Sequence, residues 1–169
     1  MNGDTESEGH IPIVTVATVH STRSVATDDD WDLETTVIRM SDDFDESALQ
    51  GLDAFSHIDV VYVFDRVDAD KVETGARHPR GNPDWPQVGI FAQRAKNRPN
   101  RLGVTTCAVL GVNGREIAVR GLDAIDGTPV VDIKPYMREF GPRGPVRQPR
   151  WATELMSRYW DSSDPSPEG

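Results

Sequence analysis

Short apolar stretches, separated by segments rich in Gly, Pro and charged residues, recur along the whole chain. The strongest stretch, residues 58–67, contains Val60-Val61-Tyr62-Val63-Phe64 and predicts a strand at the centre of a sheet. Turn residues bound the other stretches, which predict further strands over residues 11–19, 34–40, 88–93, 103–112, 116–121 and 129–133. This pattern predicts a mainly β fold, a small β barrel with short helices and a C-terminal helix.

Only two segments favour helices. A short helix is expected over residues 44–49, with Ser41 as its N-cap and Gly51 at its end. The closing helix is expected over residues 151–160, with Trp151, Leu155 and Tyr159 on one side. Neither a G-x-G-x-x-G after a strand nor a phosphate-binding G-x-x-x-x-G-K-[ST] occurs, which excludes the common nucleotide folds.

The length of 169 residues predicts one domain, over residues 11–160. We expect a disordered polar lead over residues 1–10 and a polar tail over residues 161–169. The single cysteine, Cys107, lies in an apolar run, so we expect a buried thiol and no internal disulfide. With no signal peptide and no apolar run near about 18 residues, the sequence predicts a cytoplasmic protein without membrane contact.

The formal net charge of −10 is unevenly distributed. Residues 1–50 hold twelve acids against Arg23 and Arg39, while the remainder is balanced. The acidic run from Asp28 to Asp30 is expected to be a solvated loop. Two segments are basic: residues 77–101, with six Lys or Arg against Asp84, and residues 138–150, with four Arg against Glu139. They are either solvated surface or a patch that binds phosphates, for which arginine is well suited.

Four polar segments, at residues 51–58, 64–66, 88–104 and 121–136, interrupt the strand pattern. The first contains Phe55-Ser56-His57-Ile58, in which His57 is most simply structural. The third reads G-I-F-A-Q-R-A-K-N-R-P-N from Gly89, and the fourth reads G-L-D-A-I-D-G-T-P-V-V-D-I-K-P-Y from Gly121. A hairpin explains the tight Asp126-Gly127 turn but not the many polar and rigid residues around it.

Over residues 11–136, these motifs and their order resemble the TsaA-like tRNA adenine N6-methyltransferases. The resemblance implies S-adenosylmethionine as cofactor, held in loops of a small β barrel that is usually a homodimer. It also implies N6-methylation of threonylcarbamoyladenosine beside the tRNA anticodon, so the expected partner is the anticodon loop. Trp85 and Tyr136 are candidates to stack on an unpaired base.

The resemblance also implies the site residues. Cofactor contacts are expected from the fourth motif and from residues near it: Arg94, Val104, Ala124, Ile125, Asp126, Gly127, Asp65 and Arg66. Asp126 is the first choice to accept the proton from the adenine amine, and Asp65 the second. Substrate contacts are expected from Arg98, Asn100, Lys134 and Tyr136, and no metal site is expected.

Four departures from the family pattern leave alternatives open. The family usually has His at Asp65, and S-P-F-R-P-N-P-I-G where this chain has A-K-N-R-P-N-R-L-G. Its early Pro-Arg-Gln motif is not evident in residues 21–31, where Arg23 is the one cation. Longer members carry a C-terminal extension associated with tRNA. The alternatives are a methyltransferase acting on a small metabolite or free nucleoside, and a non-catalytic module that binds S-adenosylmethionine.

Overall fold

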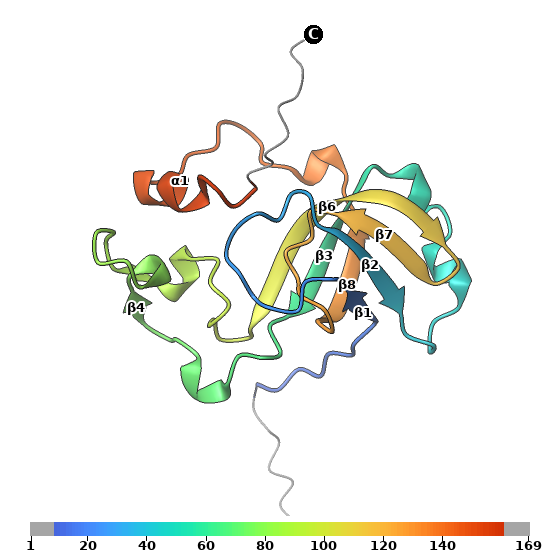
Figure 1. Ribbon diagram of the computed structural model, residues 1–169, viewed down its shortest axis with the longest axis horizontal. Helices are drawn as coiled ribbons and strands as arrows, with labels where there is room; N and C mark the ends of the chain where they lie inside the picture. Colours follow the sequence, from blue (N-terminus) through green and yellow to red (C-terminus); the bar gives the residue numbers. More distant parts are fainter. Residues whose placement is uncertain (1–8, 161–169) are drawn as a thin grey trace, which may run out of the picture.

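Six antiparallel strands close a barrel in the computed structural model, which describes residues 9–160 (Figure 1). The strand order around the barrel is β1-β2-β7-β6-β3-β8. Their bounds are Ala17–His20 (β1), Thr35–Met40 (β2), His57–Val63 (β3), Leu102–Asn113 (β6), Glu116–Arg120 (β7) and Pro129–Pro135 (β8). A separate two-stranded sheet pairs β4 (Ala76–Arg77) with β5 (Val88–Gly89). The predicted mainly β barrel is confirmed.

The strand predicted to be central, β3, lies between β6 and β8. Its side chains alternate, with Ile58, Val60 and Tyr62 pointing into the core and their neighbours partly exposed. Because every second side chain of a strand points inward, the core of the barrel is filled by the inward side chains of all the strands. These are Ala17, Val19, Ile38, Cys107, Ile117, Val119 and Val130. Cys107 is buried, as expected.

The helices are short. Six are 3-10 turns: Glu46–Leu49 (η1), Leu52–Ala54 (η2), Ala69–Lys71 (η3), Pro79–Gly81 (η4), Ile90–Ala92 (η5) and Arg138–Phe140 (η6). The helix expected over residues 44–49 is η1, and its N-cap is Asp45, whose carboxylate accepts the N–H of Ser47, rather than Ser41. Gly51, with φ of 84°, ends this segment in the left-handed region that glycine adopts without strain.

Four predicted elements differ from the structure by four residues or more at one end. The central strand ends at Val63 instead of residue 67. The first strand begins at Ala17 instead of residue 11, and Ile11, Ile13 and Val14 are exposed. The strand expected over residues 88–93 ends at Gly89 and continues as η5. The C-terminal helix, α1, spans Arg150–Met156 instead of residues 151–160. Residues 1–8 of the expected lead and the whole expected tail, residues 161–169, lie outside the described residues.

The last described segment, residues 150–160, is called the C-terminal strap below. Its helix α1 lies on the same side of the barrel as β4 (Figure 1). There Trp85 Nε1 donates a hydrogen bond of 2.9 Å to Glu154. After α1, the carbonyls of Arg158 and Tyr159 accept the N–H groups of Asp30 and Trp31.

No helix within residues 9–160 has the length and apolar character needed to cross a membrane.

Candidate functional site

The loop between β7 and β8, residues 121–128, is fixed to the end of β1 and the chain that follows it. Asp126 N–H donates to the carbonyl of Arg23, and Gly127 N–H donates to that of Val19, each at 2.8 Å. Leu122 and Ala124 are buried and anchor the loop in the core. Gly127 has φ of 83°, which makes the tight turn accessible without strain. The β7–β8 loop therefore has a defined conformation against residues 19–23.

The carboxylate of Asp126 is half-buried and has one backbone partner. Its Oδ1 accepts the N–H of Ser21 at 3.0 Å. Within the described part of the chain, Oδ2 has no hydrogen-bond partner. One oxygen of Asp126 thus holds the loop against residue 21, while the other can accept a proton or a hydrogen bond from a ligand.

Arg66 joins the end of β3 to this loop. Its Nη2 donates to the carbonyl of Asp126 at 2.9 Å, and its Nη1 donates to the carbonyl of Ser24 at 3.0 Å. Asp65, one residue earlier, is exposed. The structure therefore brings Arg66, Asp126 and Gly127 together, and it places Asp65 on the rim beside them.

Arg94 and Val104 form a second pair at the same end of the barrel. Nη2 of Arg94 donates to the Val104 carbonyl at 2.5 Å, and Val104 is 44% exposed. The next residue, Thr105, contacts the carboxylate of Asp123 in the β7–β8 loop. Arg94 therefore lies close to the start of the loop. It is linked to the loop indirectly, through Val104 and Thr105 of β6.

The four expected substrate residues divide between the two ends of the barrel. Arg98 donates to the carbonyl of Gln93 at 2.8 Å, and Asn100 is exposed in the same turn, which leads into β6 at the loop end. Lys134 and Tyr136 lie at the end of β8, beside the start of β3, and Lys134 pairs with Asp132. A strand of seven residues spans about 20 Å, so one subunit does not bring Lys134 and Tyr136 to Asp126.

A group of hydroxyls around Asp123 went undetected in the sequence. Tyr62 donates to Asp123 Oδ1 at 2.9 Å, Thr105 donates to the same oxygen, and Tyr159 donates to Oδ2. Burial raises the pKa of Tyr159, as does the charge of Asp123, while Arg94 and Arg80 act in the opposite direction. The position of Asp123 in the fourth motif was the one sequence signal that pointed to this group. Nothing in the sequence indicates that Tyr159 lies beside it.

The acidic run is a mostly exposed loop, as expected, but it also makes contacts that were not predicted. Arg80 contacts Asp28 and Asp29, and the guanidinium of Arg23 donates to the carbonyls of Asp29 and Asp30. The same guanidinium lies 3.7 Å from the ring centre of Trp31. Arg23, the one cation in the stretch where the Pro-Arg-Gln motif was sought, therefore organises the loop that supports Asp126.

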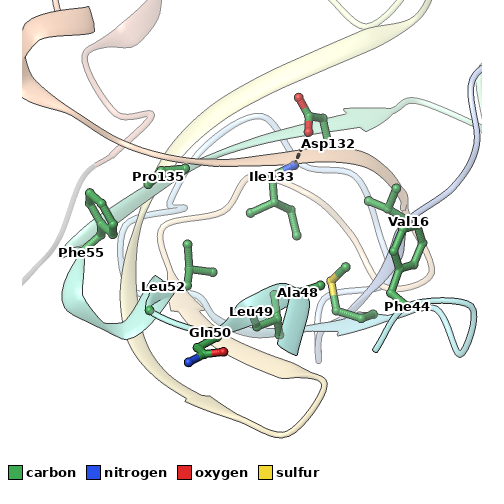
Figure 2. Close-up of a pocket in the computed structure, with 12 residues that line it drawn as sticks. Val16, Phe44, Ala48, Leu49, Gln50, Leu52, Phe55, Asp132, Ile133 and Pro135 are labelled. Atoms are coloured by element: carbon green, nitrogen blue, oxygen red, sulfur yellow. Dashed lines mark hydrogen bonds between the residues drawn. The ribbon is translucent and has the colours of Figure 1, made fainter. Parts of the chain in front are cut away.

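Two pockets lie outside the group of Arg66, Asp126 and Gly127, and the second of them reaches the start of the β7–β8 loop at Gly121. One, of about 370 Å³, is mainly apolar and contains none of the expected site residues (Figure 2). Its walls come from residues around η1 and η2 and from the strands beside them: Val16, Met40, Phe44, Ala48, Leu49, Gln50, Gly51, Leu52, Phe55, Asp132, Ile133 and Pro135. The second, of about 190 Å³, is lined by residues that include His57, Arg120 and Trp160. Across residues 9–160, no group of three or more His, Cys, Asp or Glu is placed to hold a metal ion.

A closed six-stranded antiparallel barrel, with Arg66, Asp126 and Gly127 brought together at one end, has the architecture expected of a TsaA-like barrel. The chain belongs to the TrmO family, since residues 21–141 match the family model described as the tRNA-methyltransferase O N-terminal domain. The chain also resembles a solved structure of TrmO with a TM-score of 0.67 and 25% identity, over 82% of this chain and 63% of that one. TrmO from Pseudomonas aeruginosa shares the fold, with a TM-score of 0.68 and 22% identity, over 84% of this chain and 62% of that one.

Curated relatives support the same family. A probable S-adenosyl-L-methionine-binding protein of Archaeoglobus fulgidus is 40% identical over 103 residues, which are 61% of this chain and 26% of that protein. The human tRNA (adenine(37)-N6)-methyltransferase is 36% identical over 104 residues, 62% of this chain and 23% of the human protein. A putative S-adenosylmethionine-dependent methyltransferase, RcsF, of Pseudomonas aeruginosa is 39% identical over 97 residues, 56% of this chain and 41% of that protein. The chain thus spans about a quarter of the length of the first two relatives.

Proposed function

We propose that this protein binds S-adenosylmethionine at the loop end of the barrel and transfers its methyl group to the N6 amine of an adenine next to the tRNA anticodon. The observation that carries the proposal is the hydrogen bonding of Arg66 to both Ser24 and Asp126. Through it, three segments far apart in the sequence meet at one end of the barrel. The names of the family and of several relatives agree with this activity.

The side chains at this end fit the chemistry of the cofactor. Arg94 uses Nη2 for the Val104 carbonyl and keeps its other donors for the methionine carboxylate. Val104 offers exposed apolar surface, and Gly127 lets a ligand approach the backbone of the loop. When bound, S-adenosylmethionine would supply an electrophilic methyl group on its sulfonium.

The remaining work of the protein is to position the acceptor and to remove one proton. We assign the proton transfer to Asp126, because Oδ1 is held by Ser21 and Oδ2 is available to accept the proton that leaves the adenine N6. Asp65, exposed on the rim, is the second choice. The free positive charges of Arg66, Arg98 and Lys96 would attract the phosphates of an anticodon loop.

A homodimer is part of the proposal. Within one subunit, Lys134 and Tyr136 lie at the end of the barrel opposite the β7–β8 loop. A second copy in the opposite orientation would bring them to the cofactor end. Light scattering of the purified protein tests this arrangement, and a monomer at working concentration contradicts it.

The decisive test of the acceptor is mass spectrometry of tRNA nucleosides from a strain that lacks the gene. Loss of the N6-methyl group, with recovery when the gene is restored, is expected. Intact methylation in the deletion strain contradicts tRNA as the substrate.

The second candidate is methyl transfer to a small metabolite or a free nucleoside. The contacts of Arg80 with Asp28 and Asp29 favour it. They neutralise one positive charge of the basic segment at residues 77–101, which leaves fewer charges to bind RNA phosphates. The third is a module that binds the cofactor without catalysis, in line with the name of the Archaeoglobus relative. Calorimetry with S-adenosylmethionine, combined with turnover of tRNA and of adenosine, separates the three.

A further inference from the structure

The carboxylate of Asp123 is held by hydroxyls from three separate parts of the chain. Tyr62 comes from β3 and Thr105 from β6, both in the barrel wall, and both donate to Oδ1. Tyr159 comes from the C-terminal strap and donates to Oδ2. Asp123 directly precedes Ala124, so its orientation sets the start of the segment that turns at Asp126 and Gly127.

Two of the three hydroxyls are rigidly placed. Tyr62 is 1% exposed and Thr105 is 6% exposed, and both are fixed by strand pairing. Burial and the charge of Asp123 raise the pKa values of Tyr62 and Tyr159, so both phenols stay protonated and donate. Tyr159 is therefore the one member of the group whose position depends on a segment outside the barrel.

The C-terminal strap contacts the same two segments that form the proposed cofactor site. The carbonyls of Arg158 and Tyr159 accept the N–H groups of Asp30 and Trp31, at 3.3 and 3.1 Å. On the other side, a β-carbon at Gly121 would lie 3.9 Å from the ring of Trp160. The strap thus contacts both the loop that follows β1 and the β7–β8 loop. These two loops are also joined directly, because Asp126 N–H donates to the carbonyl of Arg23.

We propose that Tyr159 is a positioning residue for the cofactor site. Through Asp123 it holds the β7–β8 loop in the conformation that receives S-adenosylmethionine, although it lies beyond residues 21–141, which match the family model. This inference rests on the proposed function. A preformed loop binds its ligand more tightly because less conformational entropy is lost on binding.

The test replaces Tyr159 by Phe in the full-length chain and measures hydrogen exchange without any ligand. The amides of Asp126 and Gly127, which donate to Arg23 and Val19, report on the loop directly. We expect both to exchange about tenfold faster in Tyr159→Phe, since the variant loses a hydrogen bond to a charged group and the loop then opens more often. Unchanged exchange at both amides overturns the inference.

Binding and kinetics then separate positioning from general stability. We expect the dissociation constant for S-adenosylmethionine to rise about fivefold to tenfold, with the KM for the cofactor following it, while kcat changes less than twofold. Glu154→Ala is the matched control, because it removes the contact between the strap and Trp85 and leaves the group around Asp123 intact. An equal loss of affinity in both variants also overturns the inference, because it would assign the effect to docking of the whole strap.

The outcomes also distinguish this inference from the proposed function. Faster exchange in Tyr159→Phe, with no binding of S-adenosylmethionine by the unmodified protein, supports a positioning role and contradicts the proposed cofactor. Normal binding by both forms, with unchanged exchange, supports the cofactor and contradicts the role of Tyr159.

Discussion

The ring of Tyr62 lies directly against the backbone of Gly103 on the neighbouring strand. A β-carbon at position 103 would be 2.5 Å from Cε2 and Cζ of the ring and 2.9 Å from the hydroxyl oxygen. Gly103→Ala must therefore displace Tyr62, which is fully buried and donates to Asp123. We expect a loss of about 1–3 kcal/mol in the free energy of unfolding, as for other overpacked cores, measured by urea denaturation.

Gly111→Ala provides the control on the same strand, because a β-carbon at Gly111 meets no atom within 4 Å. Its free energy of unfolding should stay within about 0.5 kcal/mol of the unmodified protein. Equal stability of the two variants would show that Tyr62 can move without cost.

Asp126→Asn tests the assigned proton acceptor. An amide oxygen can still accept the N–H of Ser21, so the loop and the affinity for S-adenosylmethionine should be preserved. Turnover should fall by about 10²-fold or more, since the amide cannot take up the proton. Calorimetry and single-turnover methyl transfer measure the two quantities, and near-normal turnover would remove Asp126 from this role.

Arg94→Ala tests the contact with the methionine carboxylate or with a substrate phosphate. Loss of a charged hydrogen bond should weaken binding of one of them by about 1–3 kcal/mol. Arg39→Ala removes an exposed arginine that pairs with Glu116 at 3.8 Å and should leave both affinities unchanged. If the affinities of Arg94→Ala match those of the control, the assignment is wrong.

The stability of the protein should decrease at alkaline pH. Burial, followed by the charges of Asp123 and Asp59, raises the pKa of Cys107 from 9.0 to about 12. Below pH 9 both the folded and unfolded states keep the proton, and the stability is fully present. Between pH 9 and 12 the unfolded state loses the proton first, so the free energy of unfolding falls by about 1.4 kcal/mol per pH unit for this group.

Urea denaturation at several pH values measures this slope, to which Tyr62 and Tyr159 contribute at the upper end because their pKa values are also raised. Cys107→Ala should have a shallower slope just above pH 9. The native thiol should also resist a thiol reagent at pH 8. Reaction at the rate of an exposed cysteine would contradict the buried, protonated state.

Binding of an anticodon stem-loop should weaken with salt if the arginines at the loop end contact phosphates. Arg66, Arg94, Arg98 and Arg101 donate to backbone carbonyls, which leave their charges uncompensated. Four such contacts to a single-stranded loop predict a slope of about −3 for log K against log salt. Arg98→Ala should reduce the slope by about 0.7, while Lys71→Ala, whose charge pairs with Asp68, should not. A flat response contradicts an RNA interface here.

The sequence predicted the barrel well because its strands depend on local patterns. The bounds of β2, β6, β7 and β8 agree with the predicted strands within two residues, and the core of β3 was predicted although its end was placed too late. The glycine of the β6–β7 turn, Gly114, was part of the predicted hairpin. The first strand was predicted too long. Residues 11–16 have the right alternation, but β8 pairs with β1 at Ala17 and Thr18 only, and tertiary pairing overrides a local pattern.

The spatial arrangement of the candidate site residues was predictable where a motif keeps its members close together in the sequence. Ala124, Ile125, Asp126 and Gly127 form one continuous loop, and Arg66 reaches it from the end of β3, as the resemblance implies. The relation of Tyr159 to Asp123 was not predictable, because it depends on where a segment 36 residues further along the chain returns. The separation of Tyr136 from Asp126 has a similar cause, since a strand that begins at one end of a barrel must finish at the other.

The barrel is closed by its shortest pairing, two residues of β1 against two of β8, and Pro129 in that pairing has no N–H to contribute. The neighbouring bonds from Val19 to Thr128 and from Gly127 to Val19 continue this seam straight into the β7–β8 loop. A local unfolding event that detaches β1 would release Gly127 in the same movement. The β7–β8 loop and the closure of the barrel are therefore expected to unfold as one cooperative unit, and any ligand that binds at this end should stabilise the pairing of β1 with β8.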